Sequence, residues 1–126
     1  MIDCLDHLVL TVTDVERTVD FYVRGLGMVE ETFGAGRRAL RFGRQKINLH
    51  PANEAAILPR AARPGAGTAD ICFIAARPLA EVETHLREEG FAIEEGPVSR
   101  TGATGPIRSI YLRDPDGNLV EVSEYV

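Results

Sequence analysis

The sequence has few cysteines, no long apolar run and no cluster of basic residues, and each absence excludes a class of protein. The only two cysteines among the 126 residues, Cys4 and Cys72, form neither a CxxC pair nor a disulfide framework. Each lies in an apolar, strand-like run, so we expect both to be reduced and structural. No apolar run approaches the roughly 18 residues of a membrane span, and the first residues show no signal-peptide pattern. We therefore expect a cytoplasmic protein with no membrane partner.

The charge balance is acidic. Lys and Arg number 14 against 19 Asp and Glu, a formal net charge of -5. Nucleic acids and anionic membrane surfaces are bound through clustered basic residues, and no basic stripe is present, so neither is expected as a partner. Hydrophobic residues make up 44% of the chain. A chain of this length and composition predicts a single domain, residues 1–126, that folds on its own core without disulfide or metal staples.

The first half of the chain has the pattern of a β-α-β-β-β unit. The apolar, β-branched run Leu5–Val12 predicts a strand, and Thr13 with Glu16 fits a capping box that begins a helix over residues 14–24. Turn signals then separate three expected strands, at residues 28–33, 38–42 and 46–50.

The second half repeats this order after a Pro- and Gly-rich linker at residues 51–67. The expected elements are a strand at 68–74, a helix from Pro78 to Gly90, and strands at 91–93, 108–113 and 118–125. A shift of 63 positions places Gly90 on Gly27 and Asp70 on His7, so an internal duplication is the simplest interpretation. The predicted fold class is α+β: two tandem βαβββ units, about 4–50 and 68–126, whose curved mixed sheets surround a central cleft.

Five polar side chains fall on the strand faces opposite the apolar, helix-packed faces. Alternation along each strand places them there: His7, Asn48, His50, Asp70 and Glu121. A carboxylate held in such a place needs a partner, and a divalent metal with imidazole and carboxylate ligands is one solution. Spacing alone leaves three other interpretations open: a hydrogen-bonded structural histidine, a charge at Glu121 that protects an edge strand, and a turn cap at Asp70.

Two end motifs carry a family resemblance. The opening "LDHLVLTVTDVERTVDFYVRGLGM" and the closing "IYLRDPDGNLVEVSEY" resemble the vicinal oxygen chelate superfamily, which contains glyoxalase I, bleomycin- and fosfomycin-resistance proteins and extradiol dioxygenases. The segments "GRRALRFGRQKINLHP" and "EEGPVSRTGATGPIRSIYLRDPDGNL" are most similar to the subgroup of glyoxalase-domain-containing proteins. The resemblance spans almost the whole chain.

The resemblance implies a divalent metal, Zn, Ni, Mn, Co or Fe, held by the first and last strands of each unit. Carried over by position, the ligands are His7 and Glu121, with Glu121 also placed for proton transfer. Asp70 stands where many members have His. At the fourth strand the family's Glu or Gln position aligns with Asn48, while His50 lies two residues farther on; we expect His50 to be the ligand, because imidazole is the better donor, and Asn48 to contact substrate.

The substrate is expected to be a small molecule with adjacent oxygens. The loop Ser99–Arg108 has the glycine content of a closing lid, and its two guanidiniums, Arg100 and Arg108, are candidates to grip an anion. Ser109 and Tyr111 share strand parity and are similar to substrate contacts of the resistance proteins.

Three functions are compatible with the resemblance. The first is a metal-dependent glyoxalase-type lyase or isomerase, like lactoylglutathione lyase, acting on an α-hydroxycarbonyl or its adduct with a thiol such as glutathione. The second is a drug-resistance protein that transfers a thiol or only sequesters its ligand, without metal in the latter case. The third is an Fe(II) dioxygenase using His7, His50 and Glu121. Relatives of this size imply a homodimer.

Overall fold

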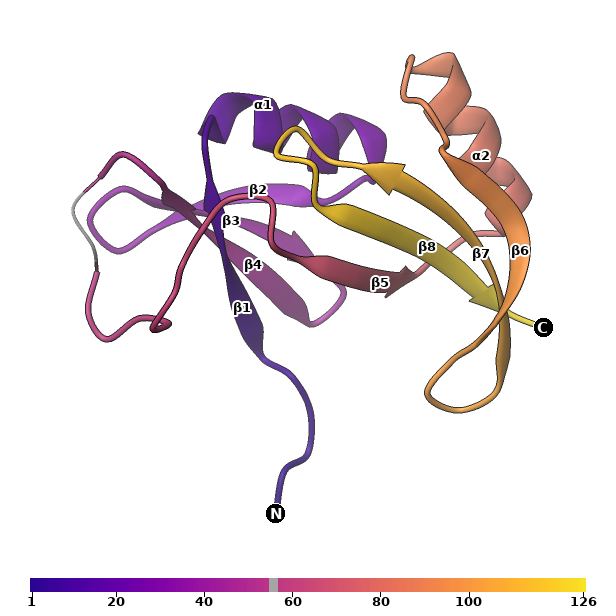
Figure 1. Ribbon diagram of the computed structural model, residues 1–126, viewed down its shortest axis with the longest axis horizontal. Coiled ribbons are helices and arrows are strands. Elements are labelled where there is room, and N and C mark those ends of the chain that lie inside the picture. Colours follow the sequence, from indigo (N-terminus) through magenta and orange to yellow (C-terminus); the bar gives the residue numbers. More distant parts are fainter. Residues whose placement is uncertain (55–56) are drawn as a thin grey trace. The chain divides into compact units, whose positions relative to one another are not determined.

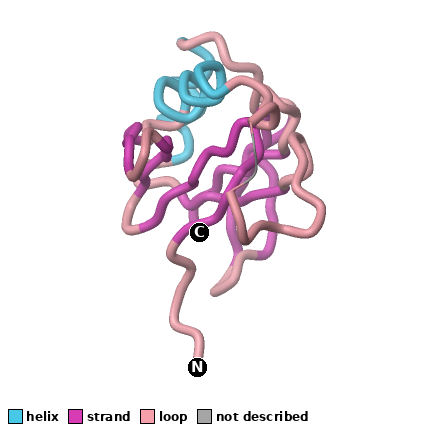
Figure 2. The backbone as a smooth tube through the Cα atoms, turned by 90° about the vertical axis from the view of Figure 1, so that its left-hand side faces the viewer, coloured by secondary structure: helices cyan, strands magenta, loops and turns pink. Residues whose placement is uncertain are grey.

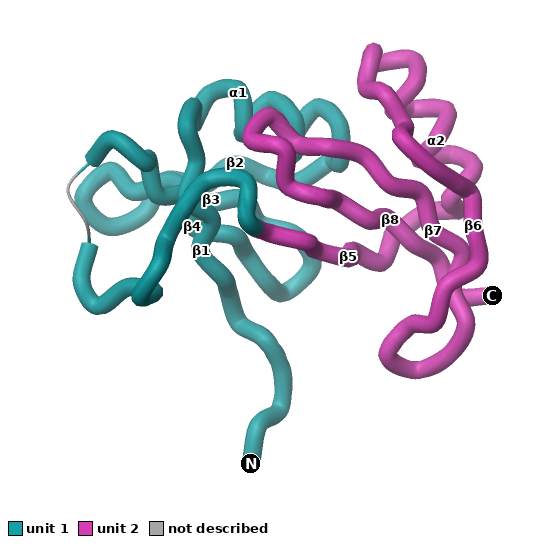
Figure 3. The backbone as a smooth tube through the Cα atoms, in the orientation of Figure 1, with its two compact units in different colours: residues 1–68 teal, residues 69–126 magenta. Residues whose placement is uncertain are grey.

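The computed structural model describes residues 1–54 and 57–126, and the chain divides into two compact units, residues 1–68 and 69–126 (Figure 3). Residues 55–56 of the predicted linker lie outside the described part. Strands make up most of the regular structure (Figure 2), and in each unit the helical segment follows the first strand (Figure 1).

Unit 1 follows the predicted order of elements. Its elements are β1 (His7–Val12), α1 (Val15–Asp20), a π-helical turn η1 (Phe21–Gly25), β2 (Val29–Phe33), β3 (Arg37–Phe42) and β4 (Gln45–Pro51). Its sheet has the order β1-β4-β3-β2, with β1 parallel to β4 and the other pairs antiparallel.

Unit 2 repeats this architecture. Its elements are β5 (Asp70–Ile74), α2 (Leu79–Glu88), β6 (Glu95–Thr101), β7 (Pro106–Arg113) and β8 (Leu119–Tyr125). The sheet order β5-β8-β7-β6, with β5 parallel to β8, is the order of unit 1. The predicted α+β class and the two βαβββ units are therefore confirmed.

One face of each sheet is apolar and packs against the helical segment of its own unit. Alternation along the strands gathers branched side chains there, because successive residues point to opposite faces. In unit 1 the buried strand residues are Leu10, Val12, Leu40, Ile47 and Leu49, which form a core with the helical Val19, Phe21 and Tyr22. In unit 2 they are Ile110, Leu112, Val120 and Val122, with Leu79 and Leu86 of α2.

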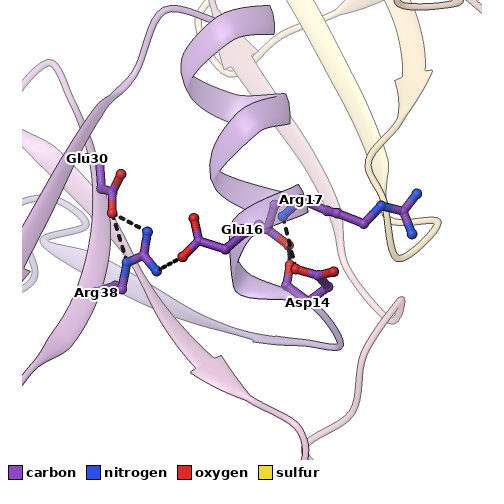
Figure 4. Close-up of polar contacts among 6 residues, drawn as sticks. Asp14, Glu16, Arg17, Glu30 and Arg38 are labelled. Atoms are coloured by element: carbon purple, nitrogen blue, oxygen red, sulfur yellow. Dashed lines mark hydrogen bonds and ion pairs between the residues drawn. The ribbon is translucent and has the colours of Figure 1, made fainter.

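The start of α1 differs from the predicted capping box. Asp14, not Thr13, is the N-cap residue, and its side chain accepts a hydrogen bond from the Arg17 amide at 3.1 Å. Glu16 does not reach back to the cap; it accepts from Arg38 of β3, which also bonds Glu30 of β2 (Figure 4). This arginine therefore ties the first turn of α1 to the sheet.

The end of both helical segments fits the duplication. Gly27 and Gly90, related by the 63-residue shift, both have positive φ, 74° and 83°, a conformation that favours glycine. The strand predicted next in unit 2 is misplaced, because residues 91–93 form no strand and β6 begins at Glu95.

The prediction that Ser99–Arg108 is a loop that closes as a lid is also wrong. Residues up to Thr101 belong to β6 and those from Pro106 belong to β7, so only residues 102–105 connect the two strands. That turn is closed by a hydrogen bond from the Gly102 amide to the Gly105 carbonyl, and the Thr104 amide donates to the Tyr125 hydroxyl. The segment is a pinned hairpin.

Candidate functional site

The face of each sheet opposite its helical segment carries the polar side chains singled out by the sequence. In unit 1 the pairs His7 with Lys46, Val9 with Asn48 and Thr11 with His50 lie side by side on β1 and β4. Paired residues of neighbouring strands point to the same face. This face therefore contains His7, Asn48 and His50 together, as the alternation predicted.

His7 is the first residue of β1 and has an ordered partner. Its Nδ1 lies 2.7 Å from Asp6 Oδ2, and the hydrogen bond from His7 lowers the pKa of Asp6. An ionised carboxylate can only accept, so this contact selects the tautomer with the proton on Nδ1. The Nε2 atom is then a lone-pair donor, and the His7 side chain is 45% exposed. The sequence reasoning missed Asp6, although it directly precedes His7.

Asn48 lies in the middle of β4 and is buried, with 5% of its surface exposed. Its side-chain oxygen Oδ1 is a buried atom with no hydrogen-bond partner. Buried polar atoms are nearly always paired, so an orphaned acceptor points to a group that the protein chain does not supply. His50, two residues farther along β4, is half-buried.

One carboxylate oxygen of Glu121, on β8, contacts the hydroxyls of two serines of unit 2. Ser109 Oγ donates to Glu121 Oε2 at 2.6 Å, and Ser123 Oγ lies 3.2 Å from the same oxygen. The two hydroxyls are 2.7 Å apart and fully buried. Ser109 was predicted as a substrate contact, whereas the structure places its hydroxyl against Glu121. Ser123 was assigned no role from the sequence, although its parity with Glu121 was visible there.

Cys72 and Asp70 share the Glu121 face. Cys72 is the direct cross-strand neighbour of Glu121, and Asp70 is the first residue of β5. Cys72 Sγ lies 3.4 Å from Ser123 Oγ, and partial burial raises the pKa of the thiol. Both cysteines, which we expected to be reduced and structural, are free and exposed, Cys4 because it precedes β1 and Cys72 because its strand parity places it on the face opposite α2.

Tyr111 and Arg100 form a polar pair beside Glu121. Tyr111 of β7 is the direct cross-strand neighbour of Glu121. Its hydroxyl oxygen accepts a hydrogen bond from Arg100 Nε at 2.9 Å, and Arg100 Nη2 lies 3.5 Å from Glu95 Oε1. Burial raises the pKa of Tyr111, and the bond from Arg100 opposes this. The hydroxyl therefore stays protonated at neutral pH, with its own proton available to an acceptor.

Arg108 is separated from this pair by the sheet itself. Arg100 pairs with Ile107, whereas Arg108 pairs with Ser99 and Glu124, so alternation puts Arg100 and Arg108 on opposite faces. The expectation that the two guanidiniums grip one anion does not fit this register.

The pairing registers identify equivalent positions in the two units. In unit 1 the residue two places after the partner of His7 is Asn48; in unit 2 the residue two places after the partner of Asp70 is Glu121. Asn48 is therefore the counterpart of Glu121, while His50 is the counterpart of Ser123. In each unit, one polar residue is the first residue of the first strand. The other lies on the last strand, two residues beyond the direct partner of the first.

The turn before β8 fixes this arrangement in unit 2. Asp114 Oδ1 accepts from the amides of Asp116 and Asn118, both at 2.9 Å, and Asn118 Nδ2 donates to Asp114 Oδ2 at 2.7 Å. The Asn118 Oδ1 atom accepts from the amide of Ala69 at 2.9 Å. Because Ala69 directly precedes Asp70, this asparagine holds the start of β5 beside the start of β8.

The residues that the structure describes contain no group of three or more His, Cys, Asp and Glu side chains arranged to hold a metal ion. The predicted ligands are divided, His7 and His50 in unit 1 and Asp70 and Glu121 in unit 2.

Among the described residues, no helix has the length and apolarity to cross a membrane.

Comparison with known proteins places the chain in a family. The model of the Glyoxalase/Bleomycin resistance protein/Dioxygenase superfamily matches residues 4–122. The chain is 54% identical over 126 residues to "Virulence protein STM3117" of Salmonella typhimurium, covering all of this chain and 87% of that protein. It is 53% identical over 121 residues to "Glyoxalase domain-containing protein RDO1" of Mycosarcoma maydis, covering 96% of this chain and 68% of the relative.

A solved structure agrees with these matches. The integron cassette protein VCH_CASS1 of V. cholerae has a TM-score of 0.97 and 52% sequence identity, with 100% of this chain and 98% of that chain covered. Members of the matching superfamily commonly use divalent metals, act on small molecules and often form dimers. The family model covers nearly the whole chain, both βαβββ units included. The chain therefore belongs to the Glyoxalase/Bleomycin resistance protein/Dioxygenase superfamily, the vicinal oxygen chelate proteins.

Proposed function

We propose that this chain is a metal-dependent lyase or isomerase of the glyoxalase type. Its substrate is a small oxygenated molecule, an α-hydroxycarbonyl or its thiol adduct. The observation that carries the proposal is the repeated polar pair: His7 with Asn48 in unit 1, and Asp70 with Glu121 in unit 2, at equivalent register positions.

The donor set suits a divalent transition metal. His7 offers Nε2, since Nδ1 is bonded to Asp6, and a carboxylate on the second nitrogen is the usual support of a metal-ligating histidine. Glu121 offers Oε1, because the serines occupy Oε2. Asp70 adds a second carboxylate, so the two negative charges balance the ion. His7, Asp70 and Glu121 are the ligands that we propose.

Asn48 is better placed than His50 to share a metal ion or a substrate with His7. With about 3.3 Å per residue and about 4.8 Å between strands, Asn48 lies roughly 8 Å from His7 between Cα atoms, and His50 roughly 14 Å. Two side chains can share one ion or one substrate across the shorter separation, but not across the longer one. The orphaned Oδ1 of Asn48 supports the same choice. We therefore place Asn48 in the site, as a ligand or as a substrate contact, and leave His50 out.

The chemistry follows from these groups. A bound divalent cation would polarise the adjacent oxygens of the substrate as a Lewis acid. The Glu121 carboxylate is the group that would move a proton at the substrate carbon. Tyr111, beside Glu121, has a hydroxyl proton to donate to a substrate oxygen, because its own oxygen accepts from Arg100.

The two alternative functions make different demands on these residues. A dioxygenase with a two-histidine, one-carboxylate triad needs His7 and His50 on the same iron, and the separation above argues against that pair. A sequestering resistance protein needs no metal. Under all three functions we propose that the protein is a homodimer. Light scattering in solution tests this by measuring the molecular mass.

Metal retention tests the proposal. The purified chain is incubated with Zn, Ni, Mn, Co and Fe(II), freed of excess ion and subjected to elemental analysis. We expect about one metal per chain, with loss of metal in His7→Ala and Glu121→Gln. His50→Ala is the matched control and should retain the ion. No metal in the unmodified chain, or retention in both ligand variants, would overturn the proposed metal chemistry and favour a sequestering protein. A chain that retains metal is then assayed for lyase and isomerase activity on α-hydroxycarbonyls and their thiol adducts.

A further inference from the structure

We propose that Ser109 is a positioning residue, which fixes the Glu121 carboxylate so that one oxygen points away from the sheet toward the ligand. This inference rests on the proposed function, since it concerns how the same carboxylate is used. The 2.6 Å bond from Ser109 Oγ to Glu121 Oε2 is the shorter of the two contacts that the serines make with this oxygen. The donor is a fully buried residue, whereas Glu121 is half-buried.

Counting protons gives the network a direction. A serine hydroxyl has one proton to donate, and an ionised carboxylate can only accept. If Ser109 donates to Glu121, its oxygen is free to accept from Ser123, 2.7 Å away. The Ser123 oxygen can in turn accept from Cys72, at 3.4 Å. Ser123 also has one proton, which it can donate to Ser109 or directly to Glu121 Oε2, 3.2 Å away, and in either case the hydroxyl protons point toward Oε2 of Glu121.

Unit 1 shows that the fold does not need these hydroxyls. Ser109 lies two residues before Tyr111, the partner of Glu121, and Arg37 lies two residues before Ala39, the partner of Asn48. Arg37 is therefore the counterpart of Ser109, and His50 is the counterpart of Ser123. The same sheet topology forms in unit 1 without either serine, and there the side-chain oxygen of Asn48 is left without a partner.

Because the same sheet forms in unit 1 without these serines, we infer that their role in unit 2 is to hold the Glu121 side chain and not to stabilise the sheet. A hydrogen bond from a buried hydroxyl stabilises the charged carboxylate and restricts its rotation. Groups that bond a ligating side chain in this way typically change metal affinity by 10–100-fold when they are removed. Ser109 therefore acts through Glu121 and touches neither ligand nor substrate itself.

The test compares Ser109→Ala with a control that loses a hydroxyl of equal burial elsewhere. Thr18 is fully buried, and its Oγ1 donates to the Asp14 carbonyl at 2.9 Å, so Thr18→Val is the control. Co²⁺ is titrated into each chain and followed by its visible absorption. We expect 10–100-fold weaker binding and an altered Co²⁺ spectrum for Ser109→Ala, and a change of less than about twofold for Thr18→Val. Ser109→Thr, which keeps the hydroxyl, should restore most of the affinity.

A second readout needs no metal. In chains labelled with ¹³C at glutamate, relaxation of the Glu121 side-chain carbons reports its mobility, with Glu121→Gln used for assignment. We expect higher mobility in Ser109→Ala than in the unmodified chain or in Thr18→Val. If the unmodified chain binds no Co²⁺, the proposed function fails, and the mobility alone decides the positioning. Unchanged mobility overturns the inference; so does unchanged Co²⁺ affinity in a chain that binds the ion.

Discussion

Replacing Asn118 by alanine should destabilise unit 2 more than any surface change. Asn118 is 1% exposed, and its side chain makes two hydrogen bonds, to Asp114 Oδ2 and from the Ala69 amide. Alanine removes both, leaving a buried carboxylate oxygen without this donor and a backbone amide without its acceptor. Each such loss costs about 1–3 kcal/mol, so the free energy of unfolding should fall by about 2–6 kcal/mol.

This is a large part of the total, since domains of this kind unfold at a cost of about 5–15 kcal/mol. Urea denaturation followed by far-UV circular dichroism measures the change, and thermal denaturation should show a midpoint lower by about 6–30 °C, at about 3–5 °C per kcal/mol for a chain of this length. The matched control is Asn53→Ala, the same substitution at an exposed turn position, which should change the free energy by less than about 0.5 kcal/mol. A loss below about 1 kcal/mol for Asn118→Ala would refute the assignment of Asn118 as the residue that holds β5 beside β8.

Two further predictions follow from the ion pairs and the thiols. The hydrogen bond from Arg38, and then its charge, lower the pKa of Glu16 below its ordinary value of 4.5. A depressed folded pKa gives stability that is present above 4.5 and lost as the pH falls through the folded value. Arg38→Gln should therefore flatten the dependence of the urea midpoint on pH between about 5 and 2, whereas an unchanged slope would exclude this pair as a source of acid sensitivity. Partial burial of the thiol raises the pKa of Cys72, so iodoacetamide at pH 8 should modify Cys72 more slowly than Cys4, as followed by peptide mass spectrometry; equal rates would contradict this.

The strand faces could be predicted from the sequence because alternation is a local property. The parity of Leu10, Val12 and Ile47 against His7 and Asn48 depends only on their spacing, and the structure reproduces it. The duplication was visible for a related reason, since the spacing of strand, helix and glycine turn recurs whatever the residues are.

The position of β6 could not be predicted from local alternation or spacing. The segment Glu95–Thr101 has Gly96 and Pro97 as its second and third residues, which are typical of loops, and Phe91–Ile93 is more apolar. An edge strand tolerates proline, because one side of it needs no ladder bond, and β6 is an edge. A Cβ at Gly96 would lie 2.4 Å from the Ser109 carbonyl oxygen, so the glycine is required by a close approach between strands. That approach is a tertiary contact.

The choice between Asn48 and His50 was also beyond the sequence. Both lie on the same face of β4, and the preference for histidine was based on its chemistry as a ligand. Which of them is near His7 depends on the register of two strands joined through the rest of unit 1. The capping of α1 failed similarly: Thr13 and Asp14 are both good N-cap residues, and the partner of Glu16 proved to be Arg38, on a distant strand.

The parallel pairing of first and last strands has a consequence for synthesis on the ribosome. His7 and Lys46 are about 40 residues apart in the chain, and Asp70 and Leu119 about 50, yet each pair is adjacent in its sheet. Such non-local contacts slow folding, because a long loop must close before they form. During translation β1 must wait for β4 to emerge, and β5 must wait for β8, before either pair of strands can form. The polar pairs His7 with Asn48 and Asp70 with Glu121 are therefore completed only once the last strand of each half of the nascent polypeptide has emerged.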